Sequence, residues 1–592
     1  MIEKRIDTDV LVIGGGMAGC FASIKAKERG LNVTLADKSY TGKAGATHYA
    51  DGNLIYFRPE RGHRLKDWVE LICQRGEYLN NRDWVEICLQ ESKDRFDDMV
   101  AWGVPFYRPE GKLFINKSDS TWVGMDEIIG GSDQGGVYEN VDFIYRKFAP
   151  ALRKKAQECG VNLLDKIMFS ELIKQDGEIV GAIGFHTTSG DLYIFQAKAV
   201  VIATGSGGFK AECNWTNYWT GDGEAMSFRA GAELTGQEFG RIGTDMPMRS
   251  QVKQGDVNQE TQLSGKIVDD IANNPFIGGM VSGWLRPNLN VNGKPALSAA
   301  WEVHCGNIPL YTDLDSWTPQ QMDWMHYYIE TRGAPTEERI GFDIFKRGKV
   351  HYPASRIWAA PVPAGAGISP IDKSCAAGVP GLYAAGDSCA TMACGAAYGG
   401  MGFGLNHAAV TGNRAGLGAA GYALKKKHIQ LDQKELIEMK GKVCAPMERK
   451  GGFTAGWLTQ IIQTITIPYF YLGVKHGSRL QAAVTIAEFI NNHLVPKLMA
   501  KDAHEWRMAQ ETKNMAHVAE MRLRASLFRT ESRGMHFRED FPRRIDPDWL
   551  AIVKLKADDG KTKVYKEPVP KKWWPDLSKA YEERYPRMFP GE

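Results

Sequence analysis

The sequence predicts an α/β protein built around a Rossmann-like dinucleotide-binding domain. The apolar run "TDVLVI" (8–13) has the length of a strand, "GGGMAGC" follows it, "FASIKAKERG" has helical character, and "NVTLAD" is a second strand. Two later runs, "AKAVVIATGSGG" (197–208) and "GVPGLYAAGD" (378–387), each lead into a glycine turn. We expect both to return to the sheet that the first two strands begin.

The first glycine turn has the spacing of a dinucleotide site. Gly14, Gly16 and Gly19 give GxGxxG between a strand and a helix. The first glycine allows the tight turn, the second lets the backbone approach a pyrophosphate, and the third lets the helix pack on the strand. Asp37 ends the second strand, 18 residues after Gly19, where a carboxylate can accept both ribose hydroxyls. This combination predicts a bound dinucleotide.

Bulk composition excludes several classes of protein. A chain of 592 residues is too long for one core, so two to four domains are expected. Net charge is +3, with no basic stripe interleaved with aromatics, which argues against a nucleic-acid partner. The ten cysteines have no metal-ligand spacing, so we expect buried, reduced thiols and no iron–sulfur cluster held by this chain.

No segment reads as a targeting signal or a membrane span. The N-terminus enters a strand at once. The most apolar late stretch (458–474) contains Gln460, Gln463 and Pro468 and is shorter than the roughly 20 residues that a bilayer helix needs. We therefore expect a buried helix and turn there, and a cytoplasmic protein that is not itself transmembrane.

Several motifs resemble the fumarate reductase/succinate dehydrogenase flavoprotein family, which includes adenylylsulfate reductase α subunits, aspartate oxidases and 3-ketosteroid dehydrogenases. They are "VLVIGGGMAG" (10–19), "AVVIATGSGG" (199–208), "TGDGEAMSFRAGAEL" (220–234), "GVPGLYAAGD" (378–387) and "RTESRGMHFREDFPRRIDPDWL" (529–550). The last of these looks like the C-terminal region of the heteromeric members. The resemblance implies that the dinucleotide is FAD.

The resemblance also implies a domain order. A discontinuous two-dinucleotide-binding FAD domain (1–240 and 350–420) would carry an inserted α+β capping domain (241–349). A helical domain (421–545) and a small C-terminal domain (546–592) would follow. Apolar residues at helical spacing in 433–443 and 480–500 agree with the helical domain. Trp573 and Trp574 in the tail would serve either as a partner surface or in docking onto the same chain.

The expected FAD contacts follow from these motifs. Asp222 and Glu224 would cap the first turn of a helix lying on the flavin site, and Asp387 would contact the ribityl–pyrophosphate part. Lys43 stands near the position at which succinate dehydrogenases attach FAD through a histidine, with His48 five residues on, so we expect non-covalent FAD. The expected cofactor residues are Gly14, Gly16, Met17, Ala18, Gly19, Asp37, Lys38, Lys43, Gly45, Ala46, Thr47, Ala203, Thr204, Gly205, Asp222, Gly386, Asp387, Gly402, Gly404 and Leu405.

The substrate residues of dicarboxylate members are missing from four expected places. Gly243 and Val362 stand where two histidines would be, and "PALSAAWEVHCGN" (295–307) lacks the proton-delivering arginine. Tyr398 stands where the substrate-binding arginine would be. A carboxylate-binding site needs fixed cations, so the four changes together argue against a C4 dicarboxylate.

The segment "AYGGMG" (397–402) offers a neutral replacement. It looks like an element of 3-ketosteroid dehydrogenases in which a tyrosine hydroxyl and a glycine N–H polarise a ketone, and the matching residues are Tyr398 and Gly402. Neutral donors suit the charge that develops on a carbonyl oxygen during hydride transfer at the β-carbon. The alternative is that Tyr398 only packs on the flavin.

Further candidates lie near or in the capping segment. Arg241 and Arg249 are spaced loosely like the arginines that adenylylsulfate reductases aim at an anion, or they form surface ion pairs. His304 could donate a proton at neutral pH, or be structural. The remaining candidates are Arg286, Trp301, Glu302, His351 and Arg356.

The leading hypothesis is an FAD-dependent oxidoreductase that moves hydride between flavin N5 and an activated C–C double bond of a non-dicarboxylate small molecule, for example an enone. It would be the catalytic subunit of a hetero-oligomer with a ferredoxin-like iron–sulfur partner. Two alternatives remain open. One is an adenylylsulfate-reductase-like enzyme acting on a sulfur anion, and the other is an electron-transfer subunit without a substrate of its own.

Overall fold

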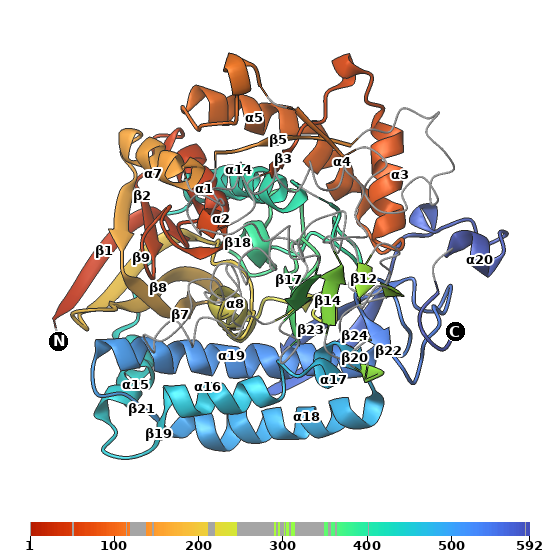
Figure 1. Ribbon diagram of the computed structural model, residues 1–592. Coiled ribbons are helices and arrows are strands. Elements are labelled where there is room, and N and C mark those ends of the chain that lie inside the picture. The colour runs from red at the N-terminus through yellow and green to blue at the C-terminus, as the bar shows by residue number, and fades with distance from the viewer. Residues whose placement is uncertain are drawn as a thin grey trace.

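The computed structural model of the chain is shown in Figure 1. It describes residues 2–49, 53–113, 115–118, 138–144, 147–210, 219–244, 364–400, 402–585 and 588–592, with short pieces between 289 and 361. These residues form an α/β protein, as predicted. Most of the expected capping segment lies outside the described residues, so the four domain ranges stay predictions.

A seven-stranded sheet lies at the centre of the molecule. Its order is β6 (Asn162–Asp165), β2 (Val33–Asp37), β1 (Glu3–Ile13), β9 (Leu192–Ile202), β8 (Glu178–His186) and β7 (Ile167–Gln175), and β18 (Leu382–Ala384) also pairs with β9. The strands from β6 to β9, and β18, run parallel, whereas β7, β8 and β9 are antiparallel. Both later runs thus return to the sheet of the first strand, as predicted.

Two helices pack closely on this sheet and on each other. In α1 (Met17–Lys27) nine of the eleven residues are buried, as expected of a helix enclosed by the core. It crosses α14 (Phe403–Ala423), where a Cβ added at Gly412 would lie 2.5 Å from the Ala18 carbonyl oxygen. This contact fixes α1, and therefore the preceding glycine turn, against the chain that follows β18.

A smaller layer covers the other side of these helices (Figure 1). It contains β3 (Asn53–Ile55), β4 (Ile115–Ser118) and β5 (Tyr138–Asp142), with α3 (Leu65–Arg75), α4 (Arg82–Gln90) and α5 (Ser92–Ala101). The helix α7 (Phe148–Glu158) lies beside α1 and contacts the short helix α2 (Gly45–Tyr49). Asn81 caps α4 by accepting the Trp84 N–H. The layer matters for function because its α3–α4 turn contacts the glycine-rich loop before α14.

Of the expected capping segment (241–349), the structure describes only short pieces. Its strands are β11 (Gly240–Thr244), β12 (Leu289–Val291), β13 (Lys294–Ala296) and β14 (Leu310–Asp313), while β15 (Lys349–Tyr352) and β16 (Ile357–Pro361) belong to the expected return to the FAD domain. Gly243 lies in β11 and His351 in β15. Arg249, Arg286, Glu302, Arg356 and Val362 lie outside the described residues.

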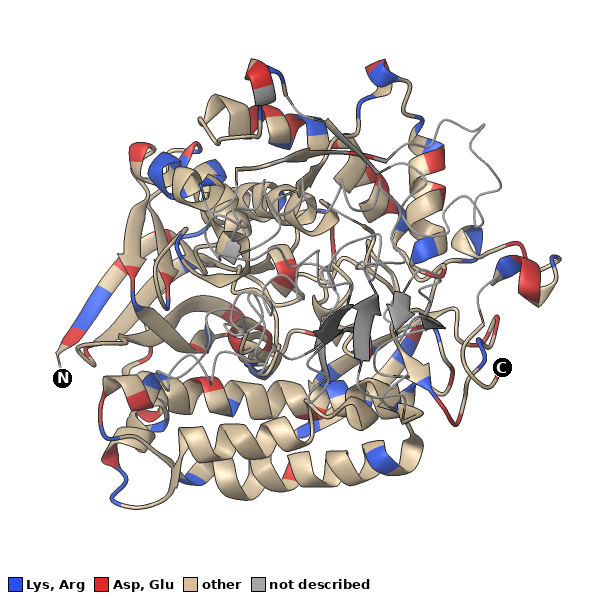
Figure 2. Cartoon of the chain, viewed as in Figure 1, with Lys and Arg blue, Asp and Glu red and all other residues tan. Residues whose placement is uncertain are grey.

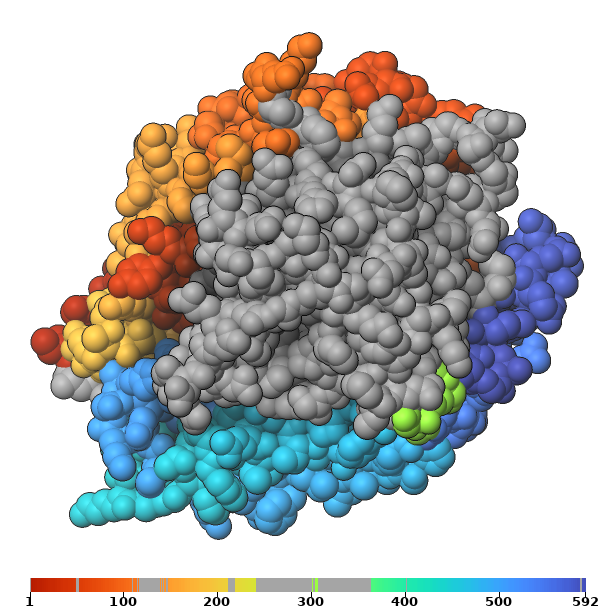
Figure 3. Space-filling model, in the orientation of Figure 1, coloured from red at the N-terminus to blue at the C-terminus, as the bar shows by residue number. Residues whose placement is uncertain are grey.

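A layer of helices lies below the sheet and appears as a continuous edge in Figure 3. It contains α15 (Gln433–Glu448), α16 (Ala455–Thr464), α17 (Tyr469–Leu472), α18 (Gly477–Phe489) and α19 (Ala503–Phe528). The helix expected over 480–500 ends earlier: α18 gives way to a π turn (Ile490–Leu494) and a 3-10 turn (Val495–Lys497). Pro496 lacks the N–H that a continued helix would need.

The stretch 458–474 forms α16, a turn and α17, as expected. None of the helices in the described part of the chain combines the length and the apolar character that a bilayer crossing requires. Figure 2 shows both signs of charge interspersed along the outer helices, in line with the net charge of +3.

The C-terminal segment completes a sheet that begins in the first half of the chain. The order of this sheet is β17 (Gly367–Ile368), β10 (Leu234–Thr235), β23 (Ala551–Asp558) and β24 (Lys561–Pro568). Trp573 and Trp574 are half-buried and pack against the main core, which agrees with docking onto the same chain. The tail ends in the short helix α20 (Tyr581–Arg584).

Candidate functional site

A deep cavity opens at the carboxyl ends of β1 and β9. It holds about 1560 Å³ of empty space, part of it open to solvent. Of the expected cofactor residues, all but Gly19 and Lys43 line it, and so does Tyr398. Gly19 serves the packing of α1 instead, and Lys43 is exposed in the turn before α2. The structure therefore brings together segments spread from residue 14 to residue 405.

The glycine turn is built of direct backbone contacts. Gly14 has φ +108°, and a Cβ there would lie 2.2 Å from the Ala203 carbonyl oxygen. A Cβ at Gly19 would lie 1.8 Å from the Gly14 carbonyl oxygen. Gly16 begins α1, so the N-terminus of this helix faces the cavity. A helix N-terminus with an open backbone is suited to a pyrophosphate.

Asp37 lies at the end of β2 and faces the cavity. Its carboxylate accepts the N–H groups of Gly15 and Ser39, both at 2.7 Å. Burial raises the pKa of Asp37 above its ordinary value, although the two backbone N–H groups act in the opposite direction. A carboxylate has about four acceptor sites, so capacity for ribose hydroxyls remains, as the sequence predicts.

Lys38 joins an ion network that sequence reasoning missed. Its Nζ contacts Asp222 Oδ2 at 2.8 Å and Glu511 Oε1 at 3.1 Å. Glu511 and Asn514 come from α19, and Asn514 Nδ2 donates to Asp222 Oδ1 at 2.8 Å. The Lys38 ammonium and two further cations hold the pKa of Glu511 well below its usual range. The helical layer thus supports the cavity wall from below.

The expected capping of α8 (Asp222–Ala230) is wrong. Asp222 and Glu224 lie in its first turn, as predicted, but neither caps it through a side-chain hydrogen bond. The Asp222 carboxylate is taken by Lys38 and Asn514. Glu224 accepts from Ser206 Oγ at 3.1 Å and Gln237 Nε2 at 3.0 Å. Tertiary partners outcompete the local cap at both positions.

Asp387 is a cavity carboxyl with a strongly shifted pKa. Burial, and to a smaller extent the nearby Glu224 carboxylate, raise its pKa to about 7. At neutral pH such a group can both donate to and accept from a hydroxyl. A chain of ligand hydroxyls, such as a ribityl chain, matches this donor and acceptor set.

The glycine-rich loop places Tyr398 in the cavity wall. Tyr398 is 7% exposed, and its hydroxyl oxygen accepts the Gly404 N–H at 2.8 Å. Gly402 has φ +77° and begins α14. Both residues line the cavity, which permits the predicted donor pair and equally the alternative that Tyr398 packs on a flavin.

Three other residues named from the sequence lie outside the set of described lining residues. His304 is not among the described lining residues; its Nε2 is 3.2 Å from Glu539 Oε2 and its ring stacks on Trp301 at 5.2 Å. Arg241 lies in β11, and its side chain is outside the described part of the structure. His48 lies in α2 and is not a lining residue of the described cavity either. The catalytic roles of His304 and Arg241 stay predictions.

The residues fit a flavin dinucleotide. The glycine turn and helix N-terminus suit a pyrophosphate, Asp37 a ribose and Asp387 a polyol, while Met168, Phe169 and Met226 give an apolar wall. In the described part of the chain, no group of His, Cys, Asp and Glu could hold a metal ion. Nine of the ten cysteines are described, and all nine are free thiols.

Comparisons with known proteins show similarity to FAD-binding flavoproteins. The family model "FAD binding domain" matches residues 9–257, and "Fumarate reductase flavoprotein C-term" matches residues 476–582. A subunit of the fumarate reductase (CoM/CoB) from Methanothermobacter marburgensis is 25% identical over 573 residues, covering 94% of this chain and 98% of its own.

Two solved structures are similar to the chain over nearly its whole length. The Sdh1 complex of Mycobacterium smegmatis matches with a TM-score of 0.73 and 25% identity, covering 96% of this chain and 95% of its own. Adenylylsulfate reductase from Archaeoglobus fulgidus matches with a TM-score of 0.72 and 20% identity, covering 96% and 97%. The second likeness, at this identity, concerns the fold alone.

Proposed function

Because the chain belongs to the flavoprotein family of fumarate reductases and succinate dehydrogenases, we propose that it is the catalytic subunit of a complex that reduces or forms an activated C–C bond in a non-dicarboxylate substrate, for example an enone. As a member of this family it is an FAD-dependent oxidoreductase. Bound FAD supplies the hydride donor or acceptor. The chain's own residues bind the cofactor, orient the substrate and stabilise charge on it.

The observation that carries the proposal is the charge of the cavity wall. Among the described lining residues, Lys38 is the single cation, and Asp222 and Glu511 already neutralise it. No guanidinium or imidazole from the described residues lines the cavity to grip a pair of carboxylates. This supports a substrate without two carboxylates.

Tyr398 and Gly402 supply a neutral alternative. The Gly404 N–H donates to the Tyr398 oxygen, which places this hydroxyl in the cavity wall. We expect this O–H and the Gly402 N–H to donate to the carbonyl oxygen of the substrate. Charge that develops there during hydride transfer would then be stabilised by preorganised donors.

An iron–sulfur partner would complete the enzyme. The match to the C-terminal family model supports a subunit of this type, and the described residues offer no metal site of their own. We propose that a ferredoxin-like subunit exchanges electrons with the FAD, giving a hetero-oligomer. The cytoplasmic location expected from the sequence stays a prediction.

The test uses purified protein with its bound FAD and reduced methyl viologen as electron donor. We expect cyclohex-2-enone or a steroid enone to be reduced faster than fumarate. Tyr398→Phe should lower the enone rate by about 10²–10³-fold, the effect of losing one preorganised donor, whereas Gly421→Ala, at an open position of α14, should leave it unchanged. Faster reduction of fumarate than of any enone would overturn the proposal.

The two alternatives make other predictions. An enzyme acting on a sulfur anion should form a sulfite-dependent flavin adduct visible in the absorption spectrum, and Arg241 in β11 is the residue to substitute first. An electron-transfer protein should show neither the adduct nor enone turnover. The flavin adduct and enone turnover are both measured on the same purified, FAD-loaded protein.

A further inference from the structure

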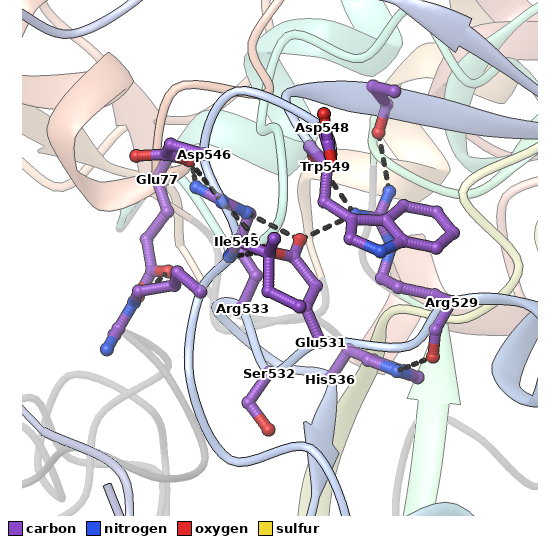
Figure 4. Close-up of polar contacts among 12 residues, drawn as sticks. Glu77, Arg529, Glu531, Ser532, Arg533, His536, Ile545, Asp546, Asp548 and Trp549 are labelled. Carbon is purple, nitrogen blue, oxygen red and sulfur yellow. Dashed lines mark hydrogen bonds and ion pairs between the residues drawn. The ribbon is translucent and has the colours of Figure 1, made fainter. Parts of the chain in front are cut away.

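We infer that a buried cluster of charged residues from the C-terminal segment positions the glycine-rich loop that carries Tyr398. The loop comprises residues 392–402. We call the group the brace cluster; its members are Glu77, Arg529, Glu531, Arg533 and Asp546, which Figure 4 labels, and Arg544, which pairs with Glu77. The inference rests on the proposed function only for the catalytic meaning of Tyr398, and not for the position of the loop.

Arg533 is the centre of the brace cluster. Its Nε and Nη2 donate to the two carboxylate oxygens of Glu531, at 2.7 and 2.9 Å, and Nη2 also donates to Asp546 at 2.7 Å. Its Nη1 donates to the Glu77 carbonyl oxygen at 3.1 Å and to the Tyr585 hydroxyl at 2.8 Å. All five guanidinium N–H groups therefore have a partner, and the side chain is fully buried.

Glu531 links Arg533 to the interior. It also accepts from Arg529 Nη1 at 2.7 Å and from the Ile545 N–H at 2.8 Å. Figure 4 shows Arg533 between Glu531 on one side and Glu77 with Asp546 on the other. A buried ion pair adds little net stability compared with apolar packing. We therefore attribute the role of these ion pairs to the single geometry that they impose, and not to added stability.

Glu77 connects the brace cluster to the α3–α4 turn. Its backbone is in the left-handed region, with φ 47°, which is strained for a residue with a side chain. Arg544 holds its carboxylate through two hydrogen bonds of 2.9 and 2.8 Å, while Arg533 holds its carbonyl oxygen. The cluster therefore fixes a turn that would relax without it.

This turn and the C-terminal segment together clamp the loop from behind. The Ala396 N–H donates to the Gly76 carbonyl oxygen at 2.9 Å, and the Ala396 carbonyl oxygen accepts the Met535 N–H at 2.9 Å. A Cβ at Gly534 would lie 2.5 Å from the Ala396 carbonyl oxygen. The backbones touch without a side chain between them, so a shift of Arg533 or Glu77 reaches Ala396 directly.

A second hold acts on the other side of Tyr398. Arg75 Nη1, at the end of α3, donates to the Gly399 carbonyl oxygen at 2.7 Å. Tyr398 thus lies between two backbone groups, at Ala396 and Gly399, that are both fixed by the residues next to Glu77. The turn therefore sets the backbone on both sides of Tyr398, while the Gly404 N–H holds the hydroxyl itself.

The experiment compares two substitutions in the FAD-loaded protein. Arg533→Lys keeps the charge but lacks the five-donor fork, and Glu77→Gln removes one charge at constant shape in case Arg533→Lys does not fold. The matched control is Arg538→Lys, whose buried guanidinium also pairs in a bidentate way, with Asp540. It reaches the brace cluster only at the Arg529 carbonyl oxygen, and in the contacts described it touches neither the α3–α4 turn nor the loop. The measurements are hydrogen exchange of peptides covering 392–402 and the visible circular dichroism of the bound flavin.

We expect Arg533→Lys or Glu77→Gln to speed exchange in 392–402 by about tenfold to hundredfold, the range for losing a hydrogen bond to a charged group, and to change the flavin signal. Arg538→Lys should do neither. The inference would be overturned if the hydrogen-exchange rate of 392–402 equalled that of wild type in both variants. It would also be overturned if Arg538→Lys raised this rate as much as they do. These readouts need no substrate, so failure of the enone assay leaves them decisive.

Discussion

Replacing Gly16 by alanine tests FAD binding separately from the stability of the fold. Gly16 has φ −76°, which alanine adopts readily, and the new Cβ would meet only the side chain of Thr47, with Oγ1 at 3.1 Å. Gly19→Ala is the contrast, because its Cβ would lie 1.8 Å from the Gly14 carbonyl oxygen whether or not FAD is bound.

The expected magnitudes follow from these distances. The apoprotein of Gly16→Ala should unfold within about 1 kcal/mol of wild type, since the Thr47 hydroxyl can move by a few tenths of an ångström. With FAD, the added methyl group lies where the pyrophosphate approaches. An extra carbon in a packed site costs about 1–3 kcal/mol, or roughly 5- to 150-fold in Kd.

The assay is titration of apoprotein with FAD, followed by the quenching of flavin fluorescence, with thermal unfolding of the apoprotein beside it. Gly421→Ala, with no atom near its Cβ, is the control for the glycine-to-alanine change itself. If Gly16→Ala binds FAD within twofold of wild type, the pyrophosphate does not lie at this turn and the placement of the cofactor is wrong.

Three further predictions concern single side chains. Asp37→Ala should weaken FAD binding by about 10- to 100-fold, because the carboxylate orders Gly15 and Ser39 as well as facing the ribose; an unchanged Kd in the same titration would contradict this. Glu511→Gln should lower the free energy of unfolding by about 3 kcal/mol near neutral pH, since it removes the buried partner of Lys38. The pKa of Glu511 is lowered in the folded state. Its contribution to stability is therefore complete above the unfolded pKa of about 4.3 and is lost as the pH falls below that value. Between pH 7 and pH 3 the unfolding temperature should fall more steeply for wild type than for the variant. His304→Gln should lower kcat by about 10²-fold, the contribution of a positioned proton donor, and a change of less than about threefold would show that the imidazole only pairs with Glu539.

Local patterns in the sequence were enough to predict the elements that form the dinucleotide half of the site. The strand, the glycine turn and α1 follow one another within 27 residues, so periodicity and glycine spacing predict them together. The return of β9 and β18 to the same sheet was also predictable, from the resemblance of both segments to strands of two-dinucleotide-binding flavoproteins. By contrast, β10 and β17 have two residues each, too few to carry a pattern.

The tertiary partners of the site could not be predicted in this way. Glu511 lies on a helix, where a glutamate usually faces water, and nothing near it in sequence reveals that Lys38 lies opposite. Asp222 and Glu224 were expected as caps because caps are local. The partners of Asp222, Lys38 and Asn514, come from distant segments, and Gln237 reaches Glu224 from beyond the end of α8. Reasoning from one sequence finds contacts between residues that are near in the chain, and it misses contacts between residues hundreds of positions apart.

The pairing of β10 with β23 has a consequence for biosynthesis. On the ribosome, β10 and β17 emerge long before the hairpin β23–β24 that covers the other side of β10. The four-stranded sheet can therefore be completed only after the C-terminal hairpin has left the exit tunnel. A chain that stops before β23 leaves the backbone groups of Leu234 and Thr235 on that side of β10 without their strand partners.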